Sequence, residues 1–141
     1  MIDIEVALEE LKLIVNRNIH DYIIPEQQGN VIRVGYMIIR YSANVGYLIF
    51  DTKKQQQVAK YYSKYAALAF SKNYMLGKDV SAISFLDTSI EKNENDIIFY
   101  KHTIEKTDNE NRKCIAKDRM HNCEIIAESA KQRLESLLFD K

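Results

Sequence analysis

Two runs of apolar residues at heptad spacing, both within residues 81–139, constrain the fold more than any other feature of this sequence. Within each run the members are alternately three and four residues apart, so they fall on one stripe of a helix. The first run is Ile83, Leu86, Ile90, Asn93, Ile97, Tyr100 and Ile104. The second run is Ala116, Met120, Cys123, Ala127, Ala130, Leu134 and Leu137. The spacing predicts two amphipathic helices, and we call the two runs together the seam.

The segment between the two runs is a polar turn, Thr107-Asp-Asn-Glu-Asn111, in which Thr107 and Glu110 have the spacing of a capping box. Folding the chain about residue 110 places the two runs in register as an antiparallel helical hairpin. The facing pairs are then Ile104 with Ala116, Ile97 with Cys123, Ile90 with Ala130, and Ile83 with Leu137. Large side chains mostly oppose small ones, which lets two helices approach closely.

Charged residues beside the seam agree with this register. Glu94 would lie near Lys131, and Lys101 near Glu124, as pairs of opposite sign. Each arm would be roughly 35–40 Å long at 1.5 Å per residue. A hairpin of that length exceeds what a small sheet can cover, so we expect part of it to project or to be covered by another chain.

The chain as a whole is predicted to be one α+β domain, because 141 residues that are 46% hydrophobic suit one ordinary core. Residues 1–30 are expected to form an amphipathic helix and a loop, with Ile4, Leu8, Leu11 and Val15 on one stripe. Residues 31–62 read as an antiparallel meander of three or four strands. Residues 63–77 read as a buried helix with Ser63 as N-cap, and residues 81–139 as the hairpin.

Charge is distributed unevenly, although the formal net charge is zero. The balance is −4 over residues 1–30, +7 over residues 31–78 and −3 over residues 79–141. A basic middle segment attracts nucleic acid, anionic lipid or an acidic protein surface. No apolar run has the length of a membrane span, and the acidic start does not resemble a signal peptide. We therefore expect a protein that is neither secreted nor membrane-bound.

The basic meander combines cations with tyrosines, as surfaces that hold phosphates and stack unpaired bases do. The candidate interaction residues here are Arg33, Arg40, Lys53, Lys54, Lys60, Tyr61 and Tyr62. Alternation along the strand places Arg40 and Tyr41 on opposite faces, so the cations and tyrosines need not share a surface. The alternative interpretation is that the tyrosines are core or rim residues and that the basic patch faces an acidic protein segment.

Catalytic and metal-binding patterns are not evident in the sequence. The chain has no nucleophile elbow and no glycine-rich phosphate loop, and its two cysteines, Cys114 and Cys123, face opposite sides of one predicted helix. His102 with Glu105 and His121 with Glu124 share helical faces, but they occupy outward heptad positions with too few ligands for a metal site. We expect no catalytic, cofactor-binding or metal-binding residues.

A second set of apolar residues lies on the hairpin outside the seam: Phe85, Ile98, Phe99, Ile125, Ile126 and Phe139. Together with Tyr61, Tyr62 and Tyr65, these residues admit two interpretations. The favoured one is that they dock the hairpin onto the rest of the domain. The other is that they form a surface for self-association, with Phe85, Phe99 and Ile126 as its candidate contact residues.

The segments Gly46-Tyr-Leu-Ile-Phe-Asp51, Tyr62-Ser-Lys-Tyr-Ala-Ala-Leu-Ala69 and Asn95-Asp-Ile-Ile-Phe-Tyr100 resemble small proteins of unassigned function encoded by marine tailed phages. The resemblance implies a viral setting, in the host cytoplasm or the virion, and it carries no activity. The leading hypothesis is a non-enzymatic structural or interaction protein of a phage particle or its assembly, which binds itself or other structural proteins. The alternative is a nucleic-acid-binding protein that uses the basic meander.

Overall fold

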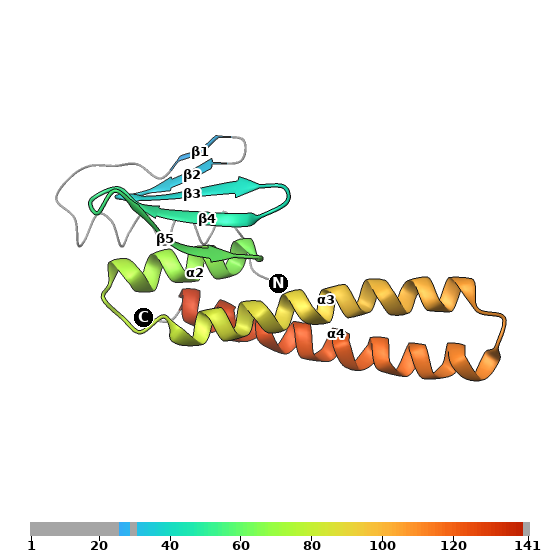
Figure 1. Cartoon of the computed structure of the whole chain (residues 1–141). Coiled ribbons are helices and arrows are strands. Elements are labelled where there is room, and N and C mark those ends of the chain that lie inside the picture. The colour runs from blue at the N-terminus through green and yellow to red at the C-terminus, as the bar shows by residue number, and fades with distance from the viewer. Residues whose placement is uncertain (1–25, 29–30, 140–141) are drawn as a thin grey trace.

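The computed structural model describes residues 26–28 and 31–139, and these have an α+β architecture (Figure 1). An antiparallel sheet comes first, with five strands in sequence order: β1 (Glu26–Gln28), β2 (Val31–Val34), β3 (Met37–Ser42), β4 (Gly46–Asp51) and β5 (Gln56–Tyr61). Within the described residues, three helices follow: α2 (Lys64–Met75), α3 (Ser81–Lys106) and α4 (Glu110–Phe139). The helix predicted near the N-terminus lies outside the described residues.

The strands match the β-branched and aromatic runs of the sequence, and the one unexpected strand is β1. Residues 26–28 fall within a segment predicted to be a loop, but they pair with β2, Gln27 opposite Ile32. The loop prediction is therefore wrong at these positions. Local composition could not show this, because the edge of β2 supplies the hydrogen-bonding partners that make a short polar segment extended.

Alternation along the strands gives the sheet two different faces. The inner face carries the core side chains Ile32, Val34, Met37, Ile39 and Ile49, all of them buried. The opposite, outer face carries the intervening residues, and the registers place Arg33 beside Ile38 and Ile38 beside Phe50. Tyr41, Tyr47 and Tyr61 lie in one cross-strand row on the inner side.

Gly46 is required where β4 begins. Its φ is +111°, and a Cβ atom there would lie 2.6 Å from the carbonyl oxygen of Tyr61 on the neighbouring strand β5. No other residue tolerates both the backbone conformation and that approach. The glycine thus allows β5 to lie against β4 up to Tyr61.

Helix α2 lies between the sheet and the hairpin, so it is buried on more than one side, as its sequence predicted (Figure 1). Every residue from Ala66 to Asn73 is buried. Ser63 is the N-cap, and its hydroxyl accepts a hydrogen bond from the amide of Tyr65 at 3.2 Å. At the other end, the amides of Gly77 and Lys78 bind the carbonyls of Tyr74 and Asn73, which is a Schellman motif.

Helices α3 and α4 form the predicted antiparallel hairpin (Figure 1). Every seam side chain is buried or half-buried. The register is the expected one, because the ammonium group of Lys131 lies 3.0 Å from the carboxylate of Glu94. The other predicted pair, Lys101 with Glu124, does not form. Both side chains are exposed, and Glu124 lies instead 4.0 Å from His121 on its own helix.

The turn of the hairpin differs from the predicted capping box. Helix α3 ends at Lys106 with Thr107 as its C-cap, so Thr107 cannot cap the next helix. Asn109 takes that role, because its side-chain oxygen accepts hydrogen bonds from the amides of Asn111 and Arg112 at 3.0 and 3.2 Å.

The hairpin projects well beyond the sheet and α2 (Figure 1). The core cluster includes α3 only as far as Ile90 and α4 only from Ala130 onward. The remaining part of both helices, which carries the turn, has the other arm as its packing partner within the described residues. This distal part is where a further partner would find free surface.

Candidate functional site

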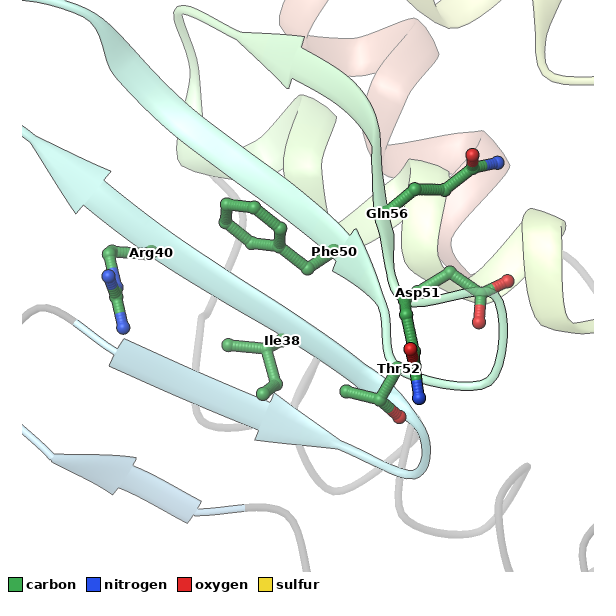
Figure 2. Close-up of a pocket in the computed structure, with 7 residues that line it drawn as sticks. Ile38, Arg40, Phe50, Asp51, Thr52 and Gln56 are labelled. Atoms are coloured by element: carbon green, nitrogen blue, oxygen red, sulfur yellow. The ribbon is translucent and has the colours of Figure 1, made fainter.

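The outer face of the sheet is the first candidate site, because three of the predicted cations lie exposed on it. Arg33, Arg40 and Lys60 alternate there with the half-buried Ile38 and Phe50. Figure 2 shows Arg40, Ile38 and Phe50 projecting from the same side of β3 and β4. They line a shallow depression of about 340 Å³. The surface is basic and partly apolar, suited to an anion attached to an apolar or planar group.

The tyrosines do not share this surface with the cations. Tyr41, Tyr47 and Tyr61 occupy the inner side, and Tyr61 is buried, with its hydroxyl 3.3 Å from that of Ser84. Tyr62 donates a hydrogen bond from its hydroxyl to Glu94 at 2.5 Å. The base-stacking part of the nucleic-acid prediction therefore finds no support in the arrangement of these tyrosines. Tyr61 and Tyr62 instead join the sheet to the hairpin.

The turn between β4 and β5 holds the remaining predicted cations in internal contacts. The ammonium group of Lys53 lies 4.4 Å above the ring of Tyr36, and that of Lys54 lies 5.6 Å from the ring of Tyr74. The buried carboxylate of Asp51 accepts hydrogen bonds from the Tyr74 hydroxyl at 2.5 Å and the Lys54 amide at 3.1 Å. The contacts of these two lysines stabilise the turn.

The pKa of Asp51 in this turn is set by hydrogen bonds and a nearby charge, which together outweigh burial. Burial by itself would raise the pKa of Asp51, but the hydrogen bonds from Tyr74 and from the turn amides, with the nearby Lys54 charge, lower it below its ordinary value. The same hydrogen bond, followed by burial, raises the pKa of Tyr74. Asp51 is therefore an ionised acceptor fixed by its partners and is poorly suited to act as a general base.

A buried carboxylate fastens the hairpin to the rest of the domain. Asp87 of α3 accepts hydrogen bonds from the amides of Tyr62 and Ser63, at 2.8 and 2.9 Å. Burial raises the pKa of Asp87, an effect only partly offset by those two hydrogen bonds. Glu94 accepts a hydrogen bond from the Tyr62 hydroxyl and pairs with Lys131. The hydrogen bond to Glu94, followed by burial and the neighbouring carboxylates, raises the pKa of Tyr62 to about 12.

The hairpin carries the second candidate site, a set of exposed apolar side chains. Phe85 is 72% exposed, Ile98 65% and Phe99 63%, and Ile125 and Ile126 are also exposed. The favoured prediction, that these residues dock the hairpin onto the domain, is wrong for all five. They lie outside the seam, and α2 and β5 reach only the base of the hairpin. The exception is Phe139, which is half-buried against the core.

Sequence patterns did not single out the residues that attach the hairpin to α2. The buried Lys72 donates a hydrogen bond to the carbonyl of Leu138, and Asn73 donates to that of Leu137 at 3.3 Å. These donors satisfy carbonyls at the C-terminal end of α4, which have no partner within the helix. The only sequence signal was their position inside an apolar helix, where a lysine and an asparagine need polar partners.

The two cysteines both lie on α4, Cys114 exposed and Cys123 half-buried. Cys114 and Cys123 are free thiols, and burial together with the nearby Asp96 carboxylate raises the pKa of Cys123. A raised pKa keeps the thiol protonated and unreactive. Among residues 26–28 and 31–139, no group of three or more His, Cys, Asp or Glu side chains could hold a metal ion. None of the helices in that part of the chain is long and apolar enough to cross a membrane.

Comparisons with models of protein families, with curated proteins and with solved structures gave no match. The surfaces of the chain itself are therefore the basis for a proposed function.

Proposed function

We propose that this chain is a non-enzymatic interaction protein whose projecting hairpin binds copies of itself or other structural proteins. The observation that supports the proposal is the exposure of Phe85, Ile98, Phe99, Ile125 and Ile126 on the hairpin. Single exposed apolar residues are ordinary on protein surfaces, whereas several large ones on one projecting element are typical of an interface. The resemblance to marine phage proteins makes a phage particle or its assembly the proposed setting.

The geometry of the hairpin agrees with such a role. The distal part contributes nothing to the core cluster, although each helix extends far beyond α2. Two well-packed helices present side chains rigidly, so little conformational entropy is lost when a partner binds. A partner would cover apolar surface that the chain itself leaves in water.

Sedimentation velocity over a wide range of protein concentration tests this proposal. We expect the mass of the native chain to rise with concentration, and we expect the double variant Phe85→Ser, Phe99→Ser to associate at least about tenfold more weakly. Val45→Ser is the control, since Val45 is an exposed apolar residue in the turn between β3 and β4, away from the hairpin. A hairpin variant that associates like the native chain would contradict the role of these residues.

Nucleic-acid binding is the second candidate function, and the exposed Arg33, Arg40 and Lys60 on the outer face of the sheet favour it. Phosphate contacts would make binding to single-stranded DNA weaken steeply with salt. The variant Arg33→Gln, Arg40→Gln would then lose affinity, whereas Lys101→Gln, Lys117→Gln removes the same charge from the hairpin and should retain it. If the native chain and both variants bind single-stranded DNA equally well, the outer face is excluded as a binding site.

A further inference from the structure

The two sides of the hairpin that flank the seam differ in chemical character. The heptad position of each surface residue places it on one side of its own helix. Two observations then show which side of α3 lies beside which side of α4. Glu94 pairs with Lys131 on one side. On the other side, the charges of Asp96 and Lys92 of α3 act on the seam residue Cys123 of α4.

The side that includes Lys92 is basic and apolar. Its cations are Lys92, Lys106, Arg112, Arg119 and Arg133, all exposed, against the single carboxylate Asp96. Its apolar members are Phe85, Phe99, Ile115 and Ile126, also exposed. We call this surface the basic side.

The side that includes Glu94 is predominantly acidic. Its base faces the domain through Asp87 and Glu94. Beyond the domain it carries the exposed carboxylates Glu105, Glu124 and Glu128, the exposed cations Lys101 and Lys117, and the exposed Ile98. A shallow hollow of about 490 Å³ lies along α4 from His121 to Gln132, lined by Glu124, Glu128 and Ile125. We call this surface the acidic side.

We propose that the basic side of one copy docks on the acidic side of a second copy. This inference rests on the proposed function and names the partner surface. Opposite charges would meet across the contact, and an apolar side chain such as Phe99 could enter the hollow beside Ile125. Two basic sides facing each other would instead place like charges together, which is unfavourable. The zero formal net charge of the chain agrees with a surface that is complementary to itself.

The available area suits a weak contact that forms at high protein concentration. The 26-residue helix α3 is about 39 Å long, and two helices side by side are roughly 20 Å wide. The basic side therefore offers on the order of 800 Å². On the acidic side the domain covers the base, and the part beyond Glu94 is about 18 Å long and offers on the order of 400 Å². A contact of this smaller area is typical of a weak, transient interface.

The contact uses two different surfaces, so it is heterologous. In a pair of copies, one copy keeps a free basic side and the other keeps a free acidic side. Such contacts continue into rings or filaments. We therefore expect the mass of the native chain to grow beyond that of a dimer as the protein concentration rises. Screening by salt should weaken this growth.

Two one-sided variants test the proposal. The basic-side variant is Phe99→Ser, Arg112→Gln, Arg119→Gln, and the acidic-side variant is Glu105→Gln, Glu124→Gln, Glu128→Gln. All six side chains are exposed, and circular dichroism should show unchanged helix content. Each variant alone should remain monomeric in sedimentation velocity at low salt. An equimolar mixture should form a one-to-one dimer that does not grow, because one intact basic side then meets one intact acidic side.

Arg33→Gln, Arg40→Gln is the control, since it removes two cations from the sheet and should associate like the native chain. If the native chain associates and the one-sided variants associate equally well, this inference is wrong while the proposed function stands. If the native chain stays monomeric but binds phosphatidylserine vesicles or single-stranded DNA through the basic side, the second copy is the wrong partner. A monomeric native chain without those activities would overturn this inference and the self-association part of the proposed function.

Discussion

Tyr62 illustrates how one residue joins the two halves of the molecule. Its amide binds Asp87 and its hydroxyl binds Glu94, two carboxylates on α3 about two helical turns apart. Both contacts come from the segment that leads from β5 into α2. Tyr62 thereby fixes the direction in which the hairpin leaves the sheet.

The raised pKa of Tyr62 leads to a pH prediction. The folded protein holds the phenolic proton more tightly than the unfolded chain, so this contribution to stability is complete below about pH 10 and is lost as pH rises toward about 12. Phenolate absorbance of the native chain, compared with Tyr62→Phe, should show one group titrating near 12. In Glu94→Gln that group should titrate closer to its ordinary value of 10.0. An unchanged titration in Glu94→Gln would contradict the hydrogen bond.

At the scale of the elements, the seam follows a pattern of large residues against small ones. Ala127 and Ala130 are buried on α4, and register places Ala130 opposite Ile90, which is 1% exposed. Asn93 is the polar member of the seam, and its amide group donates to the carbonyl of Ser89 at 2.7 Å, so it needs no partner across the interface. Close approach of the helices therefore depends on the alanines.

Enlarging one of these alanines should destabilise the protein. Ala130→Leu adds three carbon atoms at the point where α3, α4 and α2 meet. We expect a loss of about 1–3 kcal/mol in the free energy of unfolding. Urea unfolding measures this change. Gln132→Leu is the control, because Gln132 is exposed two residues away and should change stability by less than about 0.5 kcal/mol. Equal stability of the two variants would mean that the helices are not closely packed at Ala130.

At the scale of the whole molecule, the described residues form two parts. One is the core together with the base of the hairpin, and the other is the distal hairpin, which lies outside the core cluster. The core cluster reaches only Ile90 on α3 and Ala130 on α4. Under the proposed function, folding would depend on the core, and partner binding would depend on the distal hairpin.

Removing one heptad from each arm tests this division. Deleting residues 97–103 and 117–123 preserves the seam register and shortens the hairpin by about 10 Å. We expect the amide chemical shifts of residues 31–75 to remain close to their native values, and self-association to be lost because Phe99 and Arg119 are removed. Widespread shift changes in the sheet would show that the distal hairpin supports the core.

The hairpin could be predicted from sequence because a heptad repeat is a local pattern that specifies helices, seam and register together. Strands β2 to β5 and the cap at Ser63 were predictable for the same reason, since alternation and capping depend on neighbours in the chain. The charge difference between the two sides of the hairpin follows from heptad positions too, once the register is known.

The local sequence could not determine which surfaces stay free, and only the tertiary structure decided this. Phe85 and Leu138 are both apolar residues outside the predicted seam, yet Leu138 is buried against the core and Phe85 is exposed. The difference arises from where α2 and β5 meet the hairpin, through Asp87, Lys72 and Asn73. Such contacts join residues far apart in the chain, and burial depends on the space that surrounds a side chain after folding. Periodicity specifies the face of a helix, and packing decides what covers it.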